Sequence, residues 1–115
     1  MRPPAAPSQS IVDLEGASGA LYRFRQVPNP DMLPASGGNF VCIRQEPRGM
    51  KVVCCGSASD LRHAAQPYEA AVRLHLADSI LVRLNISGAV RDREHDDLVA
   101  RHQPPLEAAG AQLEP

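Results

Sequence analysis

The residues most able to do chemistry are three cysteines, Cys42, Cys54 and Cys55, the last two adjacent in the segment KVVCCGSASDLRHAA. A structural zinc site needs four thiolate or imidazole ligands, and neighbouring residues of a strand point to opposite faces, so one metal ion does not easily reach both adjacent thiols. A catalytic thiol needs a base or cation that lowers its pKa, and Arg62 and His63 are close in sequence. The favoured interpretation is that the cysteines are small buried side chains, with metal ligation and nucleophilic catalysis as the alternatives.

The run EHDD at residues 94–97 is a second candidate, because it places an imidazole among three carboxylates. A divalent metal ion can bind Glu94 or His95 together with one of the two aspartates that follow. The favoured alternative is a solvated helix face that forms ion pairs with nearby arginines. Glu94 shares a helical stripe with apolar residues, which indicates an inward carboxylate that can pair with Arg62 or Arg83.

Basic residues are a third candidate, because a cluster of them can bind phosphate groups. The residues expected to form such a nucleic-acid-binding patch are Arg44, Arg48, Lys51, Arg62 and Arg83. The formal net charge of -1 argues against tight, non-specific binding to DNA or RNA, which usually comes with a clear basic excess. Scattered surface cations are therefore the competing interpretation.

The composition also restricts the compartment. Three cysteines cannot all pair, and a small secreted scaffold would carry more, so reduced thiols in a cytoplasmic protein are expected. The segment MRPPAAPSQS lacks the apolar region of a secretory signal, and no run is long enough to span a membrane. We therefore expect no membrane partner, and the oligomeric state stays open.

The elements that must position these residues form one domain. Residues 1–18 are rich in Pro, Ala, Ser and Gly and predict a disordered tail, residues 19–107 a single domain, and residues 108–115 a C-terminal tail. Apolar residues predict strands over 39–45 and 50–55, joined as an antiparallel hairpin by a turn centred between Pro47 and Arg48. That turn places Val41 opposite Cys54 and Cys42 opposite Val53.

Helices are expected on both sides of a further strand. Ser57 and the residue three positions later resemble a capping box and predict a helix over 58–65, which Pro67 interrupts before a second helix. A strand follows over 80–86, and Ser87 caps a last helix over 88–102. The expected fold class is α/β (α+β), with a small three-stranded antiparallel sheet flanked by helices, and residues 21–25 offer one extra N-terminal strand.

The segments NFVCIRQ…KVVCCGSASDLRHA and REHDDLVARHQPPLE resemble the two conserved blocks of the GIY-YIG nuclease domain, and LVRLNIS fits its third strand. The resemblance covers about residues 39–107. It implies a compact α/β domain whose active relatives cut phosphodiester bonds with one divalent metal ion. In those relatives two tyrosines on the hairpin handle the water, an arginine on the first helix stabilises phosphate charge, and a glutamate on the later helix holds the metal.

This chain departs from that pattern at each catalytic position. The places of the two tyrosines fall on Val41 and Cys54, that of the arginine on Ala64, and that of a terminal asparagine on Glu107. The place of the glutamate falls on His95, or on the adjacent Glu94 if the helix is shifted by one residue. Such side chains cannot supply the hydroxyls, the cation and the carboxylate that hydrolysis needs. The resemblance therefore implies a catalytically degenerate domain that binds a nucleic acid or a protein and needs no cofactor.

Two alternatives to this reading remain. In the first, the chain is a DNA endonuclease that uses Mg²⁺ or Mn²⁺, with Glu94 as the metal ligand and Arg62 as the catalytic cation. Arg62 lies two residues before the arginine position of the family, about 200° away around a helix, so it does not replace that arginine by simple rotation. In the second, the chain is a protein-interaction domain with no role in nucleic-acid binding.

Overall fold

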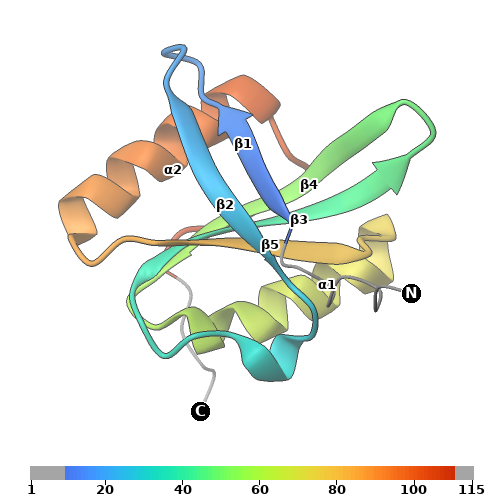
Figure 1. The fold of residues 1–115 in the computed structure, drawn as a ribbon, viewed down its shortest axis with the longest axis horizontal. Helices are drawn as coiled ribbons and strands as arrows, with labels where there is room; N and C mark the ends of the chain where they lie inside the picture. Colours follow the sequence, from blue (N-terminus) through green and yellow to red (C-terminus); the bar gives the residue numbers. More distant parts are fainter. Residues whose placement is uncertain (1–9, 111–115) are drawn as a thin grey trace, which may run out of the picture.

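The computed structural model describes residues 10–110, which form a mixed α/β fold of six strands and two α-helices (Figure 1). In chain order the elements are β1 (Ile11–Glu15), β2 (Leu21–Val27), the 3-10 helix η1 (Pro30–Met32), β3 (Gly38–Glu46), β4 (Gly49–Ala58), the 3-10 helix η2 (Leu61–Ala64), α1 (Ala65–His75), β5 (Ser79–Leu84), α2 (Gly88–His102) and β6 (Leu106–Ala108). Neither α-helix is long and apolar enough to cross a membrane.

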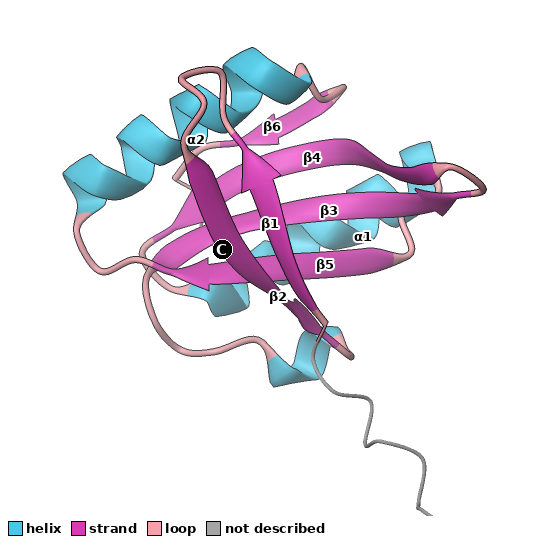
Figure 2. Ribbon diagram, turned by 45° about the horizontal axis from the view of Figure 1, so that its top comes forward, coloured by secondary structure: helices cyan, strands magenta, loops and turns pink. Residues whose placement is uncertain are grey.

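The strands form one sheet in the order β1-β2-β5-β3-β4-β6, in which only the β4–β6 pair is parallel. The two helices cover opposite faces of this sheet (Figure 1). β2 pairs with β5 only through residues 25–27, so the β1–β2 hairpin leaves the other strands at a steep angle and the sheet curls (Figure 2). The curl carries Leu14 and Phe24 onto the α2 face, where they join the core.

The predicted three-stranded sheet is only the centre of the observed one. β3 pairs antiparallel with both β4 and β5, as expected, but β1 and β2 extend one edge and β6 extends the other. The prediction of a tail over residues 1–18 is wrong for β1, where Leu14 is buried between exposed Asp13 and Glu15. Residues 1–9 lie outside the described part of the chain. Ala108 belongs to β6, so the folded domain also continues past the predicted boundary at 107.

A β-bulge changes the predicted hairpin register. Near the turn the prediction is correct, and Ile43 pairs with Val52. One extra residue, Val53, then follows in β4, so Cys42 pairs with Cys54 and Val41 with Cys55. The predicted pairing of Val41 with Cys54 is therefore wrong. Their side chains belong to the cores on opposite faces of the sheet.

The start of the first helix also differs from the prediction. β4 continues through Ala58, because residues 56–58 pair with residues 38–40 of β3, so the predicted helix over 58–65 is wrong. Asp60 caps η2 instead, and its carboxylate accepts a hydrogen bond from the Arg62 amide. Pro67 lies in the first turn of α1, where its missing N–H costs no helical hydrogen bond, and so it does not interrupt the helix. The predicted α2 is present, and Ser87 caps it as expected.

Asp97 on α2 attaches the β1–β2 hairpin to the rest of the protein. Its carboxylate accepts hydrogen bonds from the Ser18 amide at 2.8 Å, the Ser18 hydroxyl at 2.6 Å and the Tyr22 hydroxyl at 2.6 Å. A Cβ atom at Gly16 would lie 2.1 Å from the Asp97 carboxylate oxygen, so a glycine lets the loop approach this closely. The hydrogen bonds from Ser18 and Tyr22 hold the pKa of Asp97 below its ordinary value.

We expect Asp97→Asn to lower stability and to speed hydrogen exchange in residues 16–22, because the carboxylate fixes this loop. A folded-state pKa below the unfolded-state value gives a stabilisation that is fully present above about pH 4 and is lost as the pH falls through the folded-state pKa. The difference between wild type and Asp97→Asn in urea unfolding should therefore shrink in acid. Asp96→Asn, at the exposed neighbouring position, is the control and should show no such difference. An equal effect of both variants would contradict this role of Asp97.

Candidate binding groove between α1 and β6

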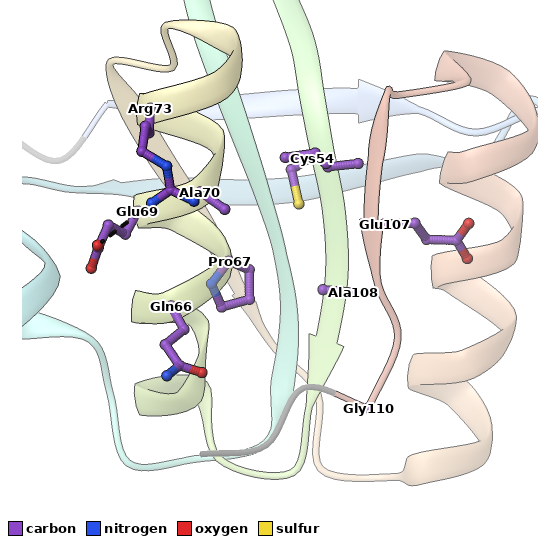
Figure 3. A pocket seen from close by; sticks show the side chains of 10 residues that line it. Cys54, Gln66, Pro67, Glu69, Ala70, Arg73, Glu107, Ala108 and Gly110 are labelled. Carbon is purple, nitrogen blue, oxygen red and sulfur yellow. Dashed lines mark ion pairs between the residues drawn. The ribbon is translucent and has the colours of Figure 1, made fainter. Parts of the chain in front are cut away.

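An open groove of about 720 Å³ lies between α1 and the edge of the sheet (Figure 3). Ligand sites in proteins typically have volumes of about 300–1,000 Å³, so the groove is large enough for a small molecule or a few residues of a peptide. The residues that line it are Cys54, Gln66, Pro67, Glu69, Ala70, Arg73, Leu106, Glu107, Ala108 and Gly110. The groove therefore contains two of the positions that the sequence singled out, Cys54 and Glu107.

The parallel pairing of β4 with β6 explains how the groove is built. Cys54 is the register partner of Leu106, and Cys55 is the partner of Glu107. Side chains of neighbouring residues in a strand point to opposite faces, so Leu106 joins Cys54 on the α1 face. The Glu107 side chain extends toward α2 instead (Figure 3). One wall of the groove is thus α1, Cys54 lies at its floor, and β6 forms the other wall.

His95 of α2 contacts the Glu107 side chain on the α2 side of β6. Its Nε2 atom lies 2.9 Å from the Glu107 Oε1 atom, although only 2% of the His95 surface is exposed. The other ring nitrogen, Nδ1, is buried without a hydrogen-bond partner in the described structure. His95 and Glu107 stand where the resemblance places the family's metal-binding glutamate and terminal asparagine. The structure brings these two positions together, and in this chain they form an imidazole–carboxylate pair.

The adjacent cysteines face opposite sides of the sheet, as the strand pattern predicts. Cys54 belongs to the α1-face core with its partner Cys42, and Cys55 belongs to the α2-face core. Burial, with the charges of Cys54 and Glu107, raises the pKa of Cys55 to about 12, so Cys55 is a poor nucleophile. A hydrogen bond with Cys42 lowers the pKa of the Cys54 thiol, while burial opposes that shift. Only Cys54 of the three lines the groove.

Glu94, the predicted metal ligand, is used in a different way. Its side chain is only 12% exposed, as an inward carboxylate should be. Arg83 Nε lies 2.9 Å and Asn85 Nδ2 lies 3.0 Å from the same carboxylate oxygen, so Arg83 rather than Arg62 is its partner. Within residues 10–110, no three His, Cys, Asp or Glu side chains are grouped so that they could hold a metal ion. Glu94 is thus a structural ion-pair residue in this arrangement.

We expect Glu94→Ala to lower the free energy of unfolding by about 1–3 kcal/mol, because it leaves the partly buried Arg83 guanidinium without its carboxylate. Glu69→Ala is a matched control, since its contact with Arg73 is 3.8 Å long and both side chains are largely exposed. Urea titration of both variants measures the difference. Equal stabilities would contradict the structural role of Glu94.

The predicted basic patch is dispersed. Arg44 and Lys51 are register partners near the β3–β4 turn, which contains Arg48. Arg62 lies beyond the other end of β4 and contacts Asp60 at 2.6 Å, an interaction that lowers the pKa of Asp60 to about 2. Arg83 faces α2, where it pairs with Glu94. These five cations therefore do not form one surface for a phosphate backbone.

The sequence singled out Cys54, which lies at the floor of the groove, but it did not predict how α1 and β6 form the two walls. The α1 wall begins directly after η2, later than the predicted helix start, and β6 has only three residues, too few for a periodic pattern. Ala64, at the family's arginine position, is buried in η2 and presents no side chain to the groove. Comparisons of this chain with protein-family models, characterised proteins and solved structures found no match.

Proposed function

We propose that the protein is a catalytically degenerate GIY-YIG-like domain and that it acts as a binding module through the groove between α1 and β6. The observation that carries the proposal is the groove itself, which Cys54 and Glu107 line, although the Glu107 side chain extends toward α2 and contacts His95 there. The resemblance assigns each of these positions to a reaction centre. The groove would then be a former active site that keeps its shape and has lost its catalytic groups.

The arrangement of the central elements supports the resemblance. Antiparallel β3, β4 and β5, with α1 between β4 and β5 and α2 after β5, match the strand and helix order that the family's two blocks predict. The bulge at Val53 removes Val41 from the face of Cys54, but Phe40 shares that face. Phe40 is aromatic and has no hydroxyl, so it too lacks the group that handles the proton of an attacking water.

Charge favours a protein segment over a nucleic acid as the partner. Of the charged residues that line the groove, Glu69 is acidic and Arg73 is basic, and the Glu107 side chain extends toward α2 instead. A nucleic-acid backbone requires neutralising cations, and the predicted cations lie elsewhere and partly in ion pairs. An extended peptide can place apolar side chains against Leu106, Ala70 and Pro67 and still fit the mixed charges of the rim.

A displayed library of random peptides tests this proposal. Peptides enriched on the wild-type protein are measured by fluorescence anisotropy against Ala70→Trp, which fills the groove, and against Ala89→Trp at an exposed position of α2. We expect the groove variant to bind about tenfold more weakly or worse, and the control to bind like wild type. Failure to enrich any peptide, or equal binding by Ala70→Trp, would contradict the proposal.

Labelled single-stranded, duplex and branched DNA at low salt supply the second arm of the test. We expect no binding, because the described cations are dispersed. Binding that weakens steeply as salt rises, and that Arg44→Glu or Lys51→Glu reduces, would show that the partner is a nucleic acid contacted at the β3–β4 hairpin. In that case the peptide partner, and not the loss of catalysis, is the part of the proposal that fails.

A further inference from the structure

Two cysteines are register partners at the floor of the groove, where Cys54 lines the groove and Cys42 lies beside it on β3. Cys42 and Cys54 are directly opposite each other on antiparallel strands, and both belong to the α1-face core. Directly opposite residues of such strands have Cα atoms about 4.5–5.5 Å apart, inside the range of about 4.4–6.8 Å that disulfides bridge. A bond between the two sulfur atoms therefore requires no change in strand pairing.

The two thiols differ in access and in acidity. Cys54 lines the groove (Figure 3), although only 1% of its surface is exposed, whereas Cys42 is fully buried and does not line it. Their hydrogen bond lowers the pKa of Cys54 and raises that of Cys42, which burial raises further. Cys54 is thus the more acidic of the two thiols. Cys55 is separated from this pair by the sheet, because it faces α2.

We propose that Cys54 and Cys42 form a dithiol site that reacts with hydroperoxides, in which Cys54 is the nucleophile and Cys42 the resolving thiol. This inference goes beyond the binding function and does not rest on it. Thiols that sense peroxide are typically the more acidic and accessible member of a pair whose second thiol stands nearby. The groove fits this role, because Cys54 lines it and Cys42 does not.

The reaction proceeds in two balanced steps. The Cys54 thiolate attacks one peroxide oxygen, the O–O bond breaks, and the leaving oxygen takes up a proton and departs as water or an alcohol. Cys54 is then a sulfenic acid. The Cys42 sulfur attacks the Cys54 sulfur, the S–O bond breaks, and the hydroxide leaves as water with the Cys42 proton. The two thiols together lose two electrons to the peroxide, and an external thiol reverses the disulfide by exchange.

Thiol counting on the full chain tests the proposal without any variant. Reduced protein is treated with hydrogen peroxide at low protein concentration, denatured, and alkylated with N-ethylmaleimide. The three cysteines should all be alkylated before oxidation and only Cys55 afterwards. Trypsin separates residues 26–44 from residues 52–62, so mass spectrometry should find these peptides linked. Full alkylation after peroxide, a bond between Cys54 and Cys55, or a disulfide-linked dimer would overturn the proposal.

Cysteine variants show which thiol is the nucleophile and which is the resolving thiol. Cys55→Ala should form the same disulfide as wild type. Cys42→Ala should accumulate the sulfenic acid on Cys54, and dimedone, which traps sulfenic acids, should label it roughly tenfold more than wild type. Cys42→Ser repeats this test if the alanine variant does not fold, as judged by circular dichroism. Dimedone labelling of Cys42 in Cys54→Ala, at the level expected for Cys54, would overturn the assignment of the nucleophile.

Discussion

Phe40→Ala should lower the free energy of unfolding by about 3–5 kcal/mol, a large part of the total stability of a domain of this size. Phe40 is fully buried on β3 and lies in the core between the sheet and α1. Its ring lies over Gly56, its register partner on β4, where a Cβ atom would come within 2.1 Å of the ring. The ring thus fills the space that a side chain on Gly56 would occupy, and its loss leaves a cavity beneath α1.

The same contact makes the effects of two substitutions depend on each other. Gly56→Ala alone should cost about 1–3 kcal/mol, because the new methyl group must displace the Phe40 ring. In Phe40→Ala the ring is absent, so adding Gly56→Ala should cost much less, and the double variant should be more stable than the sum of the single effects implies. Urea unfolding of the four proteins completes the cycle. Additive effects would contradict the observed packing.

Leu98→Ala should cost about 2–5 kcal/mol, because Leu98 is the apolar side chain that α2 buries in its face of the sheet. His95 is buried one turn earlier on the same helix, with its Nδ1 atom unsatisfied. His95→Leu should therefore leave stability within about 1 kcal/mol of wild type, since removing the unsatisfied Nδ1 atom offsets the loss of the hydrogen bond between Nε2 and Glu107.

Comparing Leu98→Ala with His95→Leu shows whether His95 serves to pack α2 against the sheet or has a functional role. A buried polar atom without a hydrogen-bond partner lowers the stability of the fold. An apolar residue at the same position would fill the space without this loss of stability. Thermal unfolding of both variants, with peptide binding measured in parallel, distinguishes the roles. If His95→Leu were as damaging to stability as Leu98→Ala, the imidazole would be a structural residue of α2, and its assignment to a former reaction centre would lose its support.

The centre of the fold was predictable from the sequence because its signals are local. Alternating apolar residues and the Glu46–Gly49 turn identified the hairpin, and Ser87 marked the start of α2. The edge strands were not predictable, because β1 alternates charged residues with only one fully buried leucine and β6 has three residues. Each becomes a strand through its neighbour in the sheet rather than through its own composition.

The sequence identified some residues of the candidate site, but it did not predict how they are arranged in space. Cys54, His95 and Glu107 were singled out by their positions in two motifs. The bulge at Val53 then determines which residue shares the face of Cys54, and nothing in the local sequence announces that extra residue. The partner of Glu94 was similarly open between two arginines, and the folding of β5 against α2 selects Arg83.

A plasmid-cutting assay tests most directly whether the domain has lost its chemistry. Wild-type protein, Glu94→Gln and Glu107→Ala are incubated with supercoiled plasmid and Mg²⁺ or Mn²⁺, after circular dichroism has shown that each is folded. The account predicts that the plasmid stays intact with all three proteins and both metals. Metal-dependent cutting by the wild-type protein that disappears in Glu94→Gln or Glu107→Ala would contradict it and establish a nuclease.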